Sequence, residues 1–275
     1  MKRRKKKKLS CLLHTAALAY LGAITPRLIH RPQRASQIYY AHRGLHDNEG
    51  EAPENTLAAF KKAVDQGYGI ELDVQLTKDG QVVVAHDFTL KRNCGVNLDI
   101  DTLTYEELQR FPVFKSNERI PLFTDVLQVI DGKVPLIVEL KYKNGSKICE
   151  KADAILQQYH GDYVIESFHP QAVFWYRKNR PDICRGQLSS NYDKDGDHSP
   201  IHWAMRHLLT NFLTAPDFIA YNCRDKKALS KNICRILYGI PCYAWTIKSQ
   251  EELEACREYF DYFIFEGFIP EDTTN

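Results

Sequence analysis

Two histidines, an arginine and two acidic residues occur close together in the first third of the chain. The pair His42-Arg43 comes first, Glu71 and Asp73 follow, and His86 completes the series. Histidine donates or accepts a proton near pH 7, and the arginine fork matches the geometry of a phosphate group. Carboxylate oxygens suit hard cations such as Ca²⁺ or Mg²⁺. Together these residue types indicate a metal-assisted phosphoester site.

The acidic residues have the spacing of side chains on one face of a strand. Glu71 and Asp73 are two residues apart, and Glu139 and Lys141 repeat this spacing later in the chain. Carboxylates that face an apolar interior are costly unless they are neutralised, and a divalent cation held by Glu71, Asp73 and Glu139 removes that cost. The alternative is a set of solvated or ion-paired acids, with Lys141 next to Glu71 or Glu139. The presence of both histidines favours the metal site.

Two further residues are candidates for the rim of this site. His169 lies at the end of an apolar segment and is a candidate for lining the site. Trp245 follows another apolar segment, where it forms either a wall for substrate packing or an aromatic residue at the edge of the core. Both interpretations of Trp245 are open at this point.

The elements that must position these residues alternate along the chain. Short apolar segments separated by amphipathic ones predict a parallel sheet covered by helices. Eight such units in about 240 residues favour a closed (β/α)₈ TIM barrel over an open sheet, and no Gly-rich phosphate loop follows the first strand. The candidate residues follow expected strands at the carboxyl end, where barrel active sites form. The expected strands are 38–41, 70–76, 134–141, 163–168, 183–189, 218–221, 241–247 and 262–265, with a hairpin strand at 82–85.

Capping signals mark the helices between these strands. Asn55 is the expected N-cap of a helix that Gly67 ends. Thr104 and Glu107 have the spacing of a capping box. Residues 88–120 contain few long apolar runs, so we expect them to form a small insertion after the second strand. The later helices are expected at 123–131, 146–159, 170–179, 199–212, 226–237 and 249–259.

Charge divides the chain into two parts. Residues 1–34 contain ten Lys or Arg and no Asp or Glu, whereas residues 35–275 contain 27 basic and 35 acidic residues, a charge of about −8. We therefore expect a basic leader followed by one catalytic barrel over 35–275. An acidic body argues against nucleic acid as a partner, because phosphate backbones are held by basic surfaces.

The leader contains an uncharged stretch of 17 residues, 9–25, after seven basic residues. This length is at the lower limit for crossing a bilayer and slightly long for a secretory signal. We predict an uncleaved signal anchor, with a cleaved signal peptide and an interfacial amphipathic helix as alternatives. The basic residues before the stretch place the body outside the cytoplasm, and attachment at the cytoplasmic face is the alternative. Membrane association through 1–34 is thus expected.

The cysteines do not indicate a disulfide framework. Seven cysteines are scattered over the body without CxxC spacing. Several lie in apolar runs, so buried structural thiols are expected.

An ordered series of motifs resembles the glycerophosphodiester phosphodiesterase family. The similarity covers nearly all of 38–268 and is strongest in the first half. The motifs are His42-Arg43-Gly44, Ala52-Pro53-Glu54-Asn55-Thr56, Glu71-Leu72-Asp73-Val74, Asp79-Gly80, His86-Asp87, Arg119-Ile120-Pro121-Leu122, Val138-Glu139-Leu140-Lys141, Ser167-Phe168 and Ala244-Trp245-Thr246.

This resemblance implies a (β/α)₈ barrel with a small insertion, which agrees with residues 88–120. It implies hydrolysis of glycerophosphodiesters to glycerol 3-phosphate and an alcohol, with one divalent cation, Ca²⁺ or Mg²⁺. The implied roles are acid and base for His42 and His86, metal ligands for Glu71, Asp73 and Glu139, phosphate contacts for Arg43 and Lys141, and the glycerol side for Trp245.

Two positions depart from the family pattern. Lys248 stands where the family usually has Asn, and Glu266-Gly267 stands where the last strand usually ends in Asp-Gly. Both lie at the mouth of the expected barrel, so the departures concern the preferred head group. One alternative function is a phospholipase D-like hydrolase of lysophospholipids or sphingolipids at the membrane. The other is a catalytically silent phosphodiester-binding protein, against which the two histidines argue.

Overall fold

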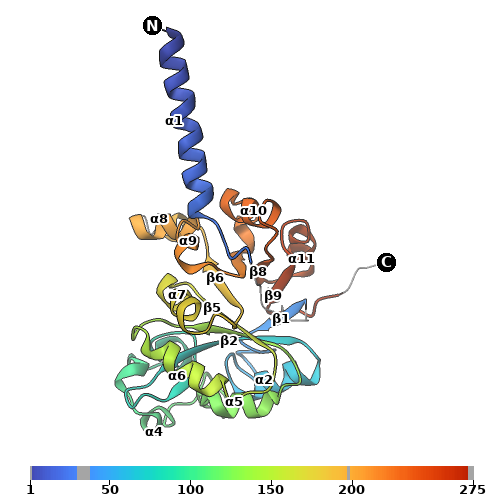
Figure 1. Ribbon diagram of the computed structural model, residues 1–275. Helices are drawn as coiled ribbons and strands as arrows, with labels where there is room; N and C mark the ends of the chain where they lie inside the picture. Colours follow the sequence, from blue (N-terminus) through green and yellow to red (C-terminus); the bar gives the residue numbers. More distant parts are fainter. Residues whose placement is uncertain (1, 30–37, 197–198, 272–275) are drawn as a thin grey trace.

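Eight parallel strands close into a barrel in the computed structural model, which describes residues 2–29, 38–196 and 199–271 (Figure 1). Strand β1 pairs with both β2 and β9, so the ring of eight parallel strands is closed, and the predicted (β/α)₈ barrel is confirmed. Strand β3 (Val82–Val84) is the hairpin partner of β2 and pairs with it in the antiparallel sense. The barrel strands are β1 Tyr39–His42, β2 Gly69–Leu76, β4 Leu136–Leu140, β5 Tyr163–Ser167, β6 Arg185–Ser189, β7 Phe218–Asn222, β8 Cys242–Ile247 and β9 Tyr262–Phe265.

Helices follow the strands around the barrel, as expected. The expected helix over 199–212 is wrong in one respect, because the chain forms two short helices there. Leu208 has φ 55°, a left-handed conformation that a right-handed helix cannot contain. The outer helices are α2 Leu57–Asp65, α5 Phe123–Ile130, α6 Lys147–Leu156, α7 Pro170–Asn179, α8 Pro200–Arg206, α9 Asn211–Thr214, α10 Leu229–Ile236 and α11 Gln250–Cys256.

The N-cap of α2 is Thr56, so the prediction of Asn55 as the cap is wrong. The Thr56 side chain accepts a hydrogen bond from the backbone N–H of Ala59. Asn55 has φ 58° and donates its side-chain amide to Asp73 at 2.9 Å. Asparagine tolerates the left-handed region better than most residues, which frees its side chain for the site.

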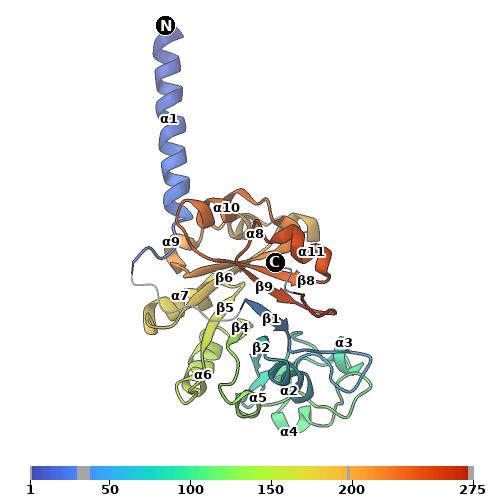
Figure 2. The same cartoon turned by 90° about the vertical axis from the view of Figure 1, so that its right-hand side faces the viewer.

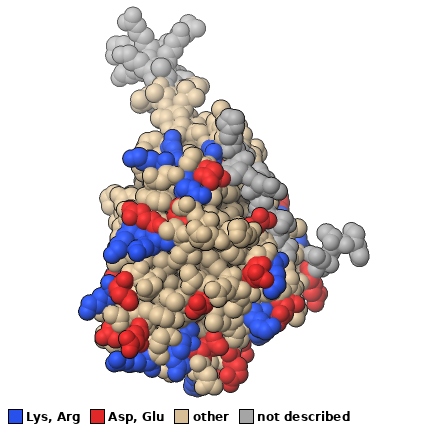
Figure 3. Space-filling view, turned by 60° about the horizontal axis from the view of Figure 1, so that its bottom comes forward, with Lys and Arg blue, Asp and Glu red and all other residues tan. Residues whose placement is uncertain are grey.

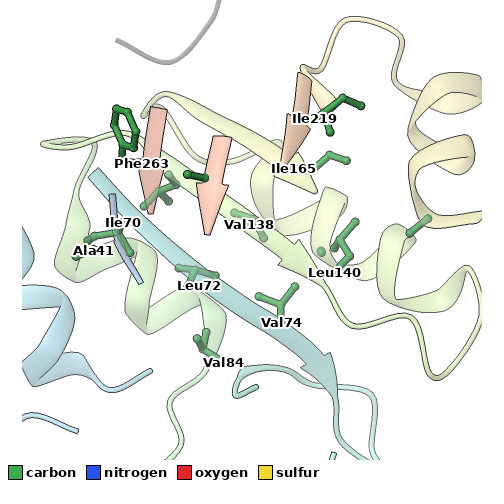
Figure 4. Close-up of a cluster of buried hydrophobic side chains, with 14 of the residues drawn as sticks. Ala41, Ile70, Leu72, Val74, Val84, Val138, Leu140, Ile165, Ile219 and Phe263 are labelled. Carbon is green, nitrogen blue, oxygen red and sulfur yellow. The ribbon is translucent and has the colours of Figure 1, made fainter. Parts of the chain in front are cut away.

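Alternate residues of each strand separate the helix-packed core from the barrel interior. Ile70, Leu72 and Val74 of β2 are fully buried and pack in one cluster with side chains of the helices (Figure 4). Glu71 and Asp73 lie between them in the sequence and therefore face the interior. A second apolar cluster fills the interior, made by Tyr40, Ile137, Val164, Cys184, Leu188, Phe218, Ala220, Tyr243 and Ile264. The two-residue repeat of the strands thus places the acidic side chains above the apolar cluster that fills the barrel interior.

The insertion forms a small unit with its own apolar cluster. It contains α3 Lys91–Cys94, η1 Ile100–Thr102 and α4 Tyr105–Leu108. The predicted capping box of Thr104 and Glu107 is present at the start of α4. In both ribbon views α4 lies at the end of the molecule farthest from α1 (Figure 2).

The leader forms the helix α1 (Lys2–Ala23), which projects from the body (Figure 1). Its base is fixed by the fully buried Ile24, whose carbonyl accepts a hydrogen bond from Asn211 at 3.1 Å. Arg27 donates its backbone N–H to Pro216 at 3.0 Å, just before β7. The leader therefore meets the barrel at the amino end of β7.

Among the described residues, no helix combines the length and the apolar character needed to cross a membrane. This finding does not support the predicted spanning anchor over 9–25, and membrane association through 1–34 stays a prediction.

Buried thiols and a mixed surface agree with the composition. The cysteines whose side chains the structure describes are free, and all of them except the half-buried Cys94 are buried. Acidic and basic side chains are interspersed over the face shown in Figure 3. This face therefore carries mixed charge.

Candidate active site

The turn after β1 begins the site. Arg43 has φ 56° and Gly44 has φ 82°, so the chain reverses in two residues. A Cβ atom on Gly44 would lie 2.9 Å from the backbone carbon of Ala59, which only glycine avoids. The turn directs the Arg43 backbone N–H to Glu71 Oε2 at 3.1 Å. The His-Arg-Gly motif therefore couples β1 to β2.

His42 lies between two carboxylates. Its Nδ1 is 2.5 Å from Glu266 Oε2, and its Nε2 is 3.8 Å from Glu71 Oε2. Burial lowers the pKa of His42 to about 4, although the hydrogen bond to Glu266 opposes this shift, so the imidazole is neutral at pH 7. The second Glu266 oxygen is 2.6 Å from Lys248 Nζ. The two departures from the family pattern are therefore in contact with each other.

Three buried carboxylates meet where β2 and β4 run side by side. Asp73 is the register partner of Glu139, and Glu71 lies two residues before Asp73. Glu71, Asp73 and Glu139 each offer an oxygen within 4.8 Å of the others. Lys141 Nζ lies 2.9 Å from Asp73 Oδ1 and 2.7 Å from Glu139 Oε1. The structure thus brings together the acids that the sequence spacing predicted.

Burial and the repulsion between neighbouring carboxylates shift the pKa values in the acid cluster. Burial, and then the neighbouring Asp73 and Glu139, raise the pKa of Glu71 well above its ordinary value. Burial also raises the pKa of Glu139. Burial acts in the same direction on Asp73, but Lys141 and the other nearby bases overcome it and hold the pKa of Asp73 well below its ordinary value. Two of the three carboxylates are therefore poorly neutralised by the side chains present.

Glu166 is a fourth acid that the sequence analysis missed. It is the register partner of Glu139 on β5 and is only 1% exposed. Its Oε2 has no hydrogen-bond partner among the described residues. Burial, followed by Glu139 and Asp73, raises the pKa of Glu166 well above its ordinary value. The available signal was the alternation of β5, which places Glu166 on the same face as the interior residue Val164.

The donor set fits a hard divalent cation. Glu71, Asp73, Glu139 and Glu166 lie together here, and two bases touch this group: Arg43 Nε is 3.4 Å from Asp73 Oδ2 and Lys141 Nζ is 2.9 Å from Asp73 Oδ1. All the acidic donors are oxygens, the ligand type of Ca²⁺ and Mg²⁺. Glu71, Asp73 and Glu139 therefore have the chemistry and spacing to hold such an ion.

Glu54 fixes Arg43, and the sequence analysis did not predict the partners of Glu54. Glu54, 3% exposed, accepts a hydrogen bond from Arg43 at 2.7 Å and two from Arg92 at 2.7 and 2.8 Å. Burial opposes ionisation of Glu54, but Arg92 and Arg43 together lower its pKa to about 2. Arg92 also bonds to Asp87 at 2.7 Å. Glu54 belongs to a motif of the family pattern, whereas Arg92 had no signal in the sequence.

His86 follows β3 in a loop that one side chain holds. The Gln75 amide donates to the backbone carbonyls of Ala85 and Asp87 at 2.7 and 2.9 Å. His86 Nδ1 lies 2.6 Å from Asp87 Oδ1, and its side chain is 35% exposed. The carboxylate contact leaves Nε2 for proton exchange with a substrate.

One small cavity of about 90 Å³ collects the candidate residues. It is lined by His42, Arg43, Glu71, His86, Glu139, Glu166, Phe168 and Trp245, among others. Asp73 and Lys141 are not in its lining; Lys141 contacts both Asp73 and Glu139 and lines the neighbouring larger cavity. His169 is instead the N-cap of α7, and it lines a neighbouring larger cavity. A phosphodiester in the small cavity would meet an arginine, two histidines and the acid cluster.

The chain is similar to known phosphodiesterases. The model of the "Glycerophosphoryl diester phosphodiesterase family" matches residues 42–260. A glycerophosphodiester phosphodiesterase from Caldanaerobacter subterraneus is 31% identical over 79% of this chain and 88% of its own length. A rat lysophospholipase D is 34% identical over 56% of this chain and 54% of its own. A phosphodiesterase from Oleispira antarctica, solved with the product sn-glycerol-3-phosphate, has a TM-score of 0.67 and 25% identity, covering 84% of this chain and 93% of that one.

Proposed function

The chain belongs to the glycerophosphoryl diester phosphodiesterase family, and on this premise we propose that it hydrolyses glycerophosphodiesters to glycerol 3-phosphate and an alcohol. We propose that the reaction uses one divalent cation, Ca²⁺ or Mg²⁺. The observation that carries the proposal is the convergence of His42, His86 and the acid cluster on one cavity.

The charges of the site suit a phosphodiester anion. Glu71, Asp73 and Glu139 would hold the cation, which when bound neutralises the phosphate and polarises its phosphorus. Arg43 and Lys141 would contact phosphate oxygens. Glu54 keeps Arg43 in place, because its carboxylate binds the guanidinium at 2.7 Å. Trp245, in the wall of the same cavity, would pack against the glycerol side.

Proton transfer needs two groups in opposite states. His42 is neutral at pH 7 because burial lowers its pKa to about 4, which suits the base that deprotonates the attacking hydroxyl. Glu266 fixes the ring from the Nδ1 side. His86 is then the acid that protonates the leaving alkoxide. The attacking group is water, which gives glycerol 3-phosphate directly, or the neighbouring glycerol hydroxyl of the substrate. Attack by that hydroxyl expels the alcohol and forms a cyclic phosphate, which water then opens to glycerol 3-phosphate.

The decisive experiment is the metal-dependent release of glycerol 3-phosphate by the full chain. Glycerophosphocholine, glycerophosphoethanolamine and glycerophosphoglycerol form the substrate panel, and activity is measured after chelation and after adding back Ca²⁺ or Mg²⁺. We expect chelation to abolish turnover and one of the two ions to restore it. Full activity in excess chelator would remove the metal from the mechanism. Binding without turnover would favour the catalytically silent alternative.

A second candidate function is hydrolysis of lysophospholipids. Three relatives are named lysophospholipase D, and a large apolar cavity adjoins the site. Comparing glycerophosphocholine with lysophosphatidylcholine separates this function from the first one.

Our proposal for the position of the enzyme in the cell depends on the leader alone. We propose membrane association through 1–34 with the catalytic body outside the cytoplasm, supported by seven basic residues before the uncharged stretch. Recovery of the full chain in the soluble fraction of disrupted cells would reject the association. Protease protection of the body in intact cells would instead favour the cytoplasmic face.

A further inference from the structure

A second group of metal-ligating side chains meets at Nδ1 of His42, the ring nitrogen that does not face Glu71. Strands β1 and β9 pair in parallel, which places His42 beside Glu266 just beyond their ends. Glu266 Oε2 lies 2.5 Å from His42 Nδ1 and 3.7 Å from His46 Nε2. One ligand atom of each of the three residues lies within 4.8 Å of the other two. This group is therefore distinct from the acid cluster of Glu71, Asp73 and Glu139.

The imidazole of His46 is buried without hydrogen bonds. Its side chain is only 13% exposed, and neither Nδ1 nor Nε2 has a hydrogen-bond partner among the described residues. Glu266 Oε2, at 3.7 Å, is too far away to accept a hydrogen bond. Buried polar groups are normally paired, because an unpaired one has lost its contacts with water. A cation between the two rings would give the His46 Nε2 lone pair the partner that it lacks.

The backbone around His46 is held in place before any ion binds. His46 donates its backbone N–H to Gly44 at 2.9 Å, and Asp47 donates to Ala52 at 2.8 Å. Glu266 is fixed in the same way, because its N–H bonds to the carbonyl that ends β8. An ion that binds here therefore does not have to order a mobile loop, which lowers the cost of binding.

A separate pocket leads to His46 from outside the catalytic cavity. It has a volume of about 640 Å³ and is lined by His46, Asp47, Phe268 and other residues on either side of the β1 turn. The lining of the catalytic cavity includes His42 but not His46. An ion can therefore approach the three ligands from the pocket without passing through the catalytic cavity.

The ligand atoms select a different ion from the one expected at the acid cluster. Imidazole nitrogen is a ligand of Zn²⁺ and similar transition metals, whereas Ca²⁺ and Mg²⁺ prefer oxygen. Two histidines and one glutamate form a known three-ligand set for Zn²⁺ with a fourth position left to water. Zn²⁺ holds each ligand at about 2.0–2.1 Å, so two ligand atoms lie at most about 4.2 Å apart. Both contacts of Glu266 Oε2 meet this limit.

Lys248 is the charged neighbour of this ligand set. Its Nζ lies 2.6 Å from the other Glu266 oxygen, Oε1, which leaves Oε2 directed at the two rings. The Lys248 side chain is 57% exposed, so water screens its repulsion of a bound cation. The contact with Lys248 can therefore persist when Oε2 becomes a metal ligand.

We propose that His42, His46 and Glu266 bind a Zn²⁺ ion that inhibits the enzyme. In the proposed reaction, His42 carries its proton on Nδ1 and uses the lone pair of Nε2 as the base. An ion on Nδ1 takes that lone pair, so the single proton of the neutral ring moves to Nε2. His42 then cannot accept a proton from the attacking hydroxyl, while the acid cluster keeps its own cation. The inhibitory effect rests on the proposed phosphodiesterase function, whereas the binding of the ion does not.

The first test measures binding alone. The full chain, saturated with Mg²⁺, is dialysed against Zn²⁺, and Co²⁺ serves as a probe whose visible absorption reports nitrogen ligation. We expect the wild type to bind one more Zn²⁺ than His46→Gln. The matched control is His207→Gln, at a half-buried histidine that ends α8 and lines neither of the two cavities, and it should bind as the wild type does. Equal binding by the wild type and His46→Gln would overturn the assignment.

The second test measures inhibition by Zn²⁺ with glycerophosphocholine as substrate. His46→Gln should keep the wild-type rate without Zn²⁺, because His46 takes no part in the reaction. The Zn²⁺ concentration for half-inhibition should rise at least about 100-fold in this variant, since loss of an outer partner of a ligand already costs 10- to 100-fold in affinity. His207→Gln should be inhibited like the wild type. Because each protein is compared with itself, a partial loss of folded enzyme does not affect the result.

The Mg²⁺ dependence separates this site from displacement of the catalytic ion. Raising the Mg²⁺ concentration should leave the half-inhibiting Zn²⁺ concentration of the wild type unchanged. Relief by Mg²⁺, with equal inhibition of His46→Gln, would place Zn²⁺ at the acid cluster and overturn the proposal. Zn²⁺ binding that leaves turnover unchanged would also overturn it. Absence of turnover with every substrate and ion would instead reject the phosphodiesterase function, and the binding test would then decide the ion site by itself.

Discussion

The first half of the barrel, β1 to β4, contributes charged side chains to the catalytic cavity, whereas the second half, β5 to β9, contributes its aromatic and apolar wall and one acid, Glu166. In the first half, His42 is held by Glu266, Arg43 by Glu54 and Glu139 by Lys141. Glu71 accepts the backbone N–H of Arg43. In the second half, Phe168 and Trp245 are held by ring contacts. The reaction chemistry is thus fixed by paired charges, and substrate range by shape.

The two halves also differ in what a substitution leaves behind. Removing one partner of a buried charge pair leaves the other charge uncompensated, a cost of several kcal/mol. Replacing an aromatic wall changes contact area and volume, which alters substrate preference more than the chemical step. The difference between the halves predicts four graded effects.

The largest effect is expected for the proposed acid. His86→Ala should lower kcat by about 10²- to 10⁴-fold, the usual contribution of a general acid, with little loss of stability because the side chain is 35% exposed. Steady-state kinetics and thermal unfolding measure the two quantities. His160→Ala, at an exposed histidine outside the site, is the matched control. Unchanged turnover in His86→Ala would move the acid to another residue.

A large loss of stability is expected at Glu54. Glu54→Gln leaves Arg43 and Arg92 without their shared carboxylate and should lower the free energy of unfolding by about 3 kcal/mol. The pKa of Glu54 is about 2 in the folded protein, below its ordinary 4.5, so its stabilisation is complete above pH 4.5 and disappears as the pH falls toward 2. Urea unfolding at pH 7 and pH 3 should show the gap to wild type shrinking. An equal gap at both pH values would contradict this account.

The pH profile tests the buried base in the first half. Because burial lowers the pKa of His42 to about 4, the base form persists well below the ordinary histidine value of 6.5. We expect kcat/KM to fall on the acid side with a midpoint near pH 4. Glu266→Gln removes a hydrogen bond that raises the pKa of His42, so the midpoint should move lower in that variant. A wild-type midpoint near 6.5 would mean that His42 is not the titrating base.

The smallest effect is expected at Lys248, in the second half. Lys248 Nζ binds the Glu266 oxygen that does not contact His42, and its side chain is 57% exposed. Lys248→Ala should lower kcat about three- to five-fold, equivalent to about 1 kcal/mol, and leave stability within about 0.5 kcal/mol. Lys248→Arg should restore most of the rate. A loss as large as that of His86→Ala would show that both halves contribute chemistry equally.

The site residues also differ in how far the sequence predicts them. The acid cluster was predictable because Glu71, Asp73 and Glu139 follow the two-residue period of strands whose carboxyl ends meet at one rim. The partners of Arg43 were not, because Arg92 approaches Glu54 from 38 residues away through the insertion. Glu166 was missed because it is a single acid in an apolar strand and belongs to no motif. Its place in the acid cluster follows only from the strand register, which sets it beside Glu139.

The fold class was also readable from the sequence, but the larger cavity beside the site was not. Alternating apolar and amphipathic segments specify a barrel whatever their exact ends. The larger cavity is lined by Phe88, Tyr142 and Leu213, which belong to no motif and come together only in the folded chain. The break between α8 and α9 depends on one left-handed residue, Leu208, that no local signal marks.

The long helix α1 has a mechanical consequence. A helix of this length spans about 33 Å, and the contacts that the described residues make with the barrel lie at its base. Because that base sits at the amino end of β7, the helix acts as a stalk whose foot is remote from the catalytic cavity. A negatively charged surface that bound the basic N-terminal end of this helix would hold the barrel at a distance from that surface. Substrate could then still diffuse to the catalytic cavity from the surrounding solution.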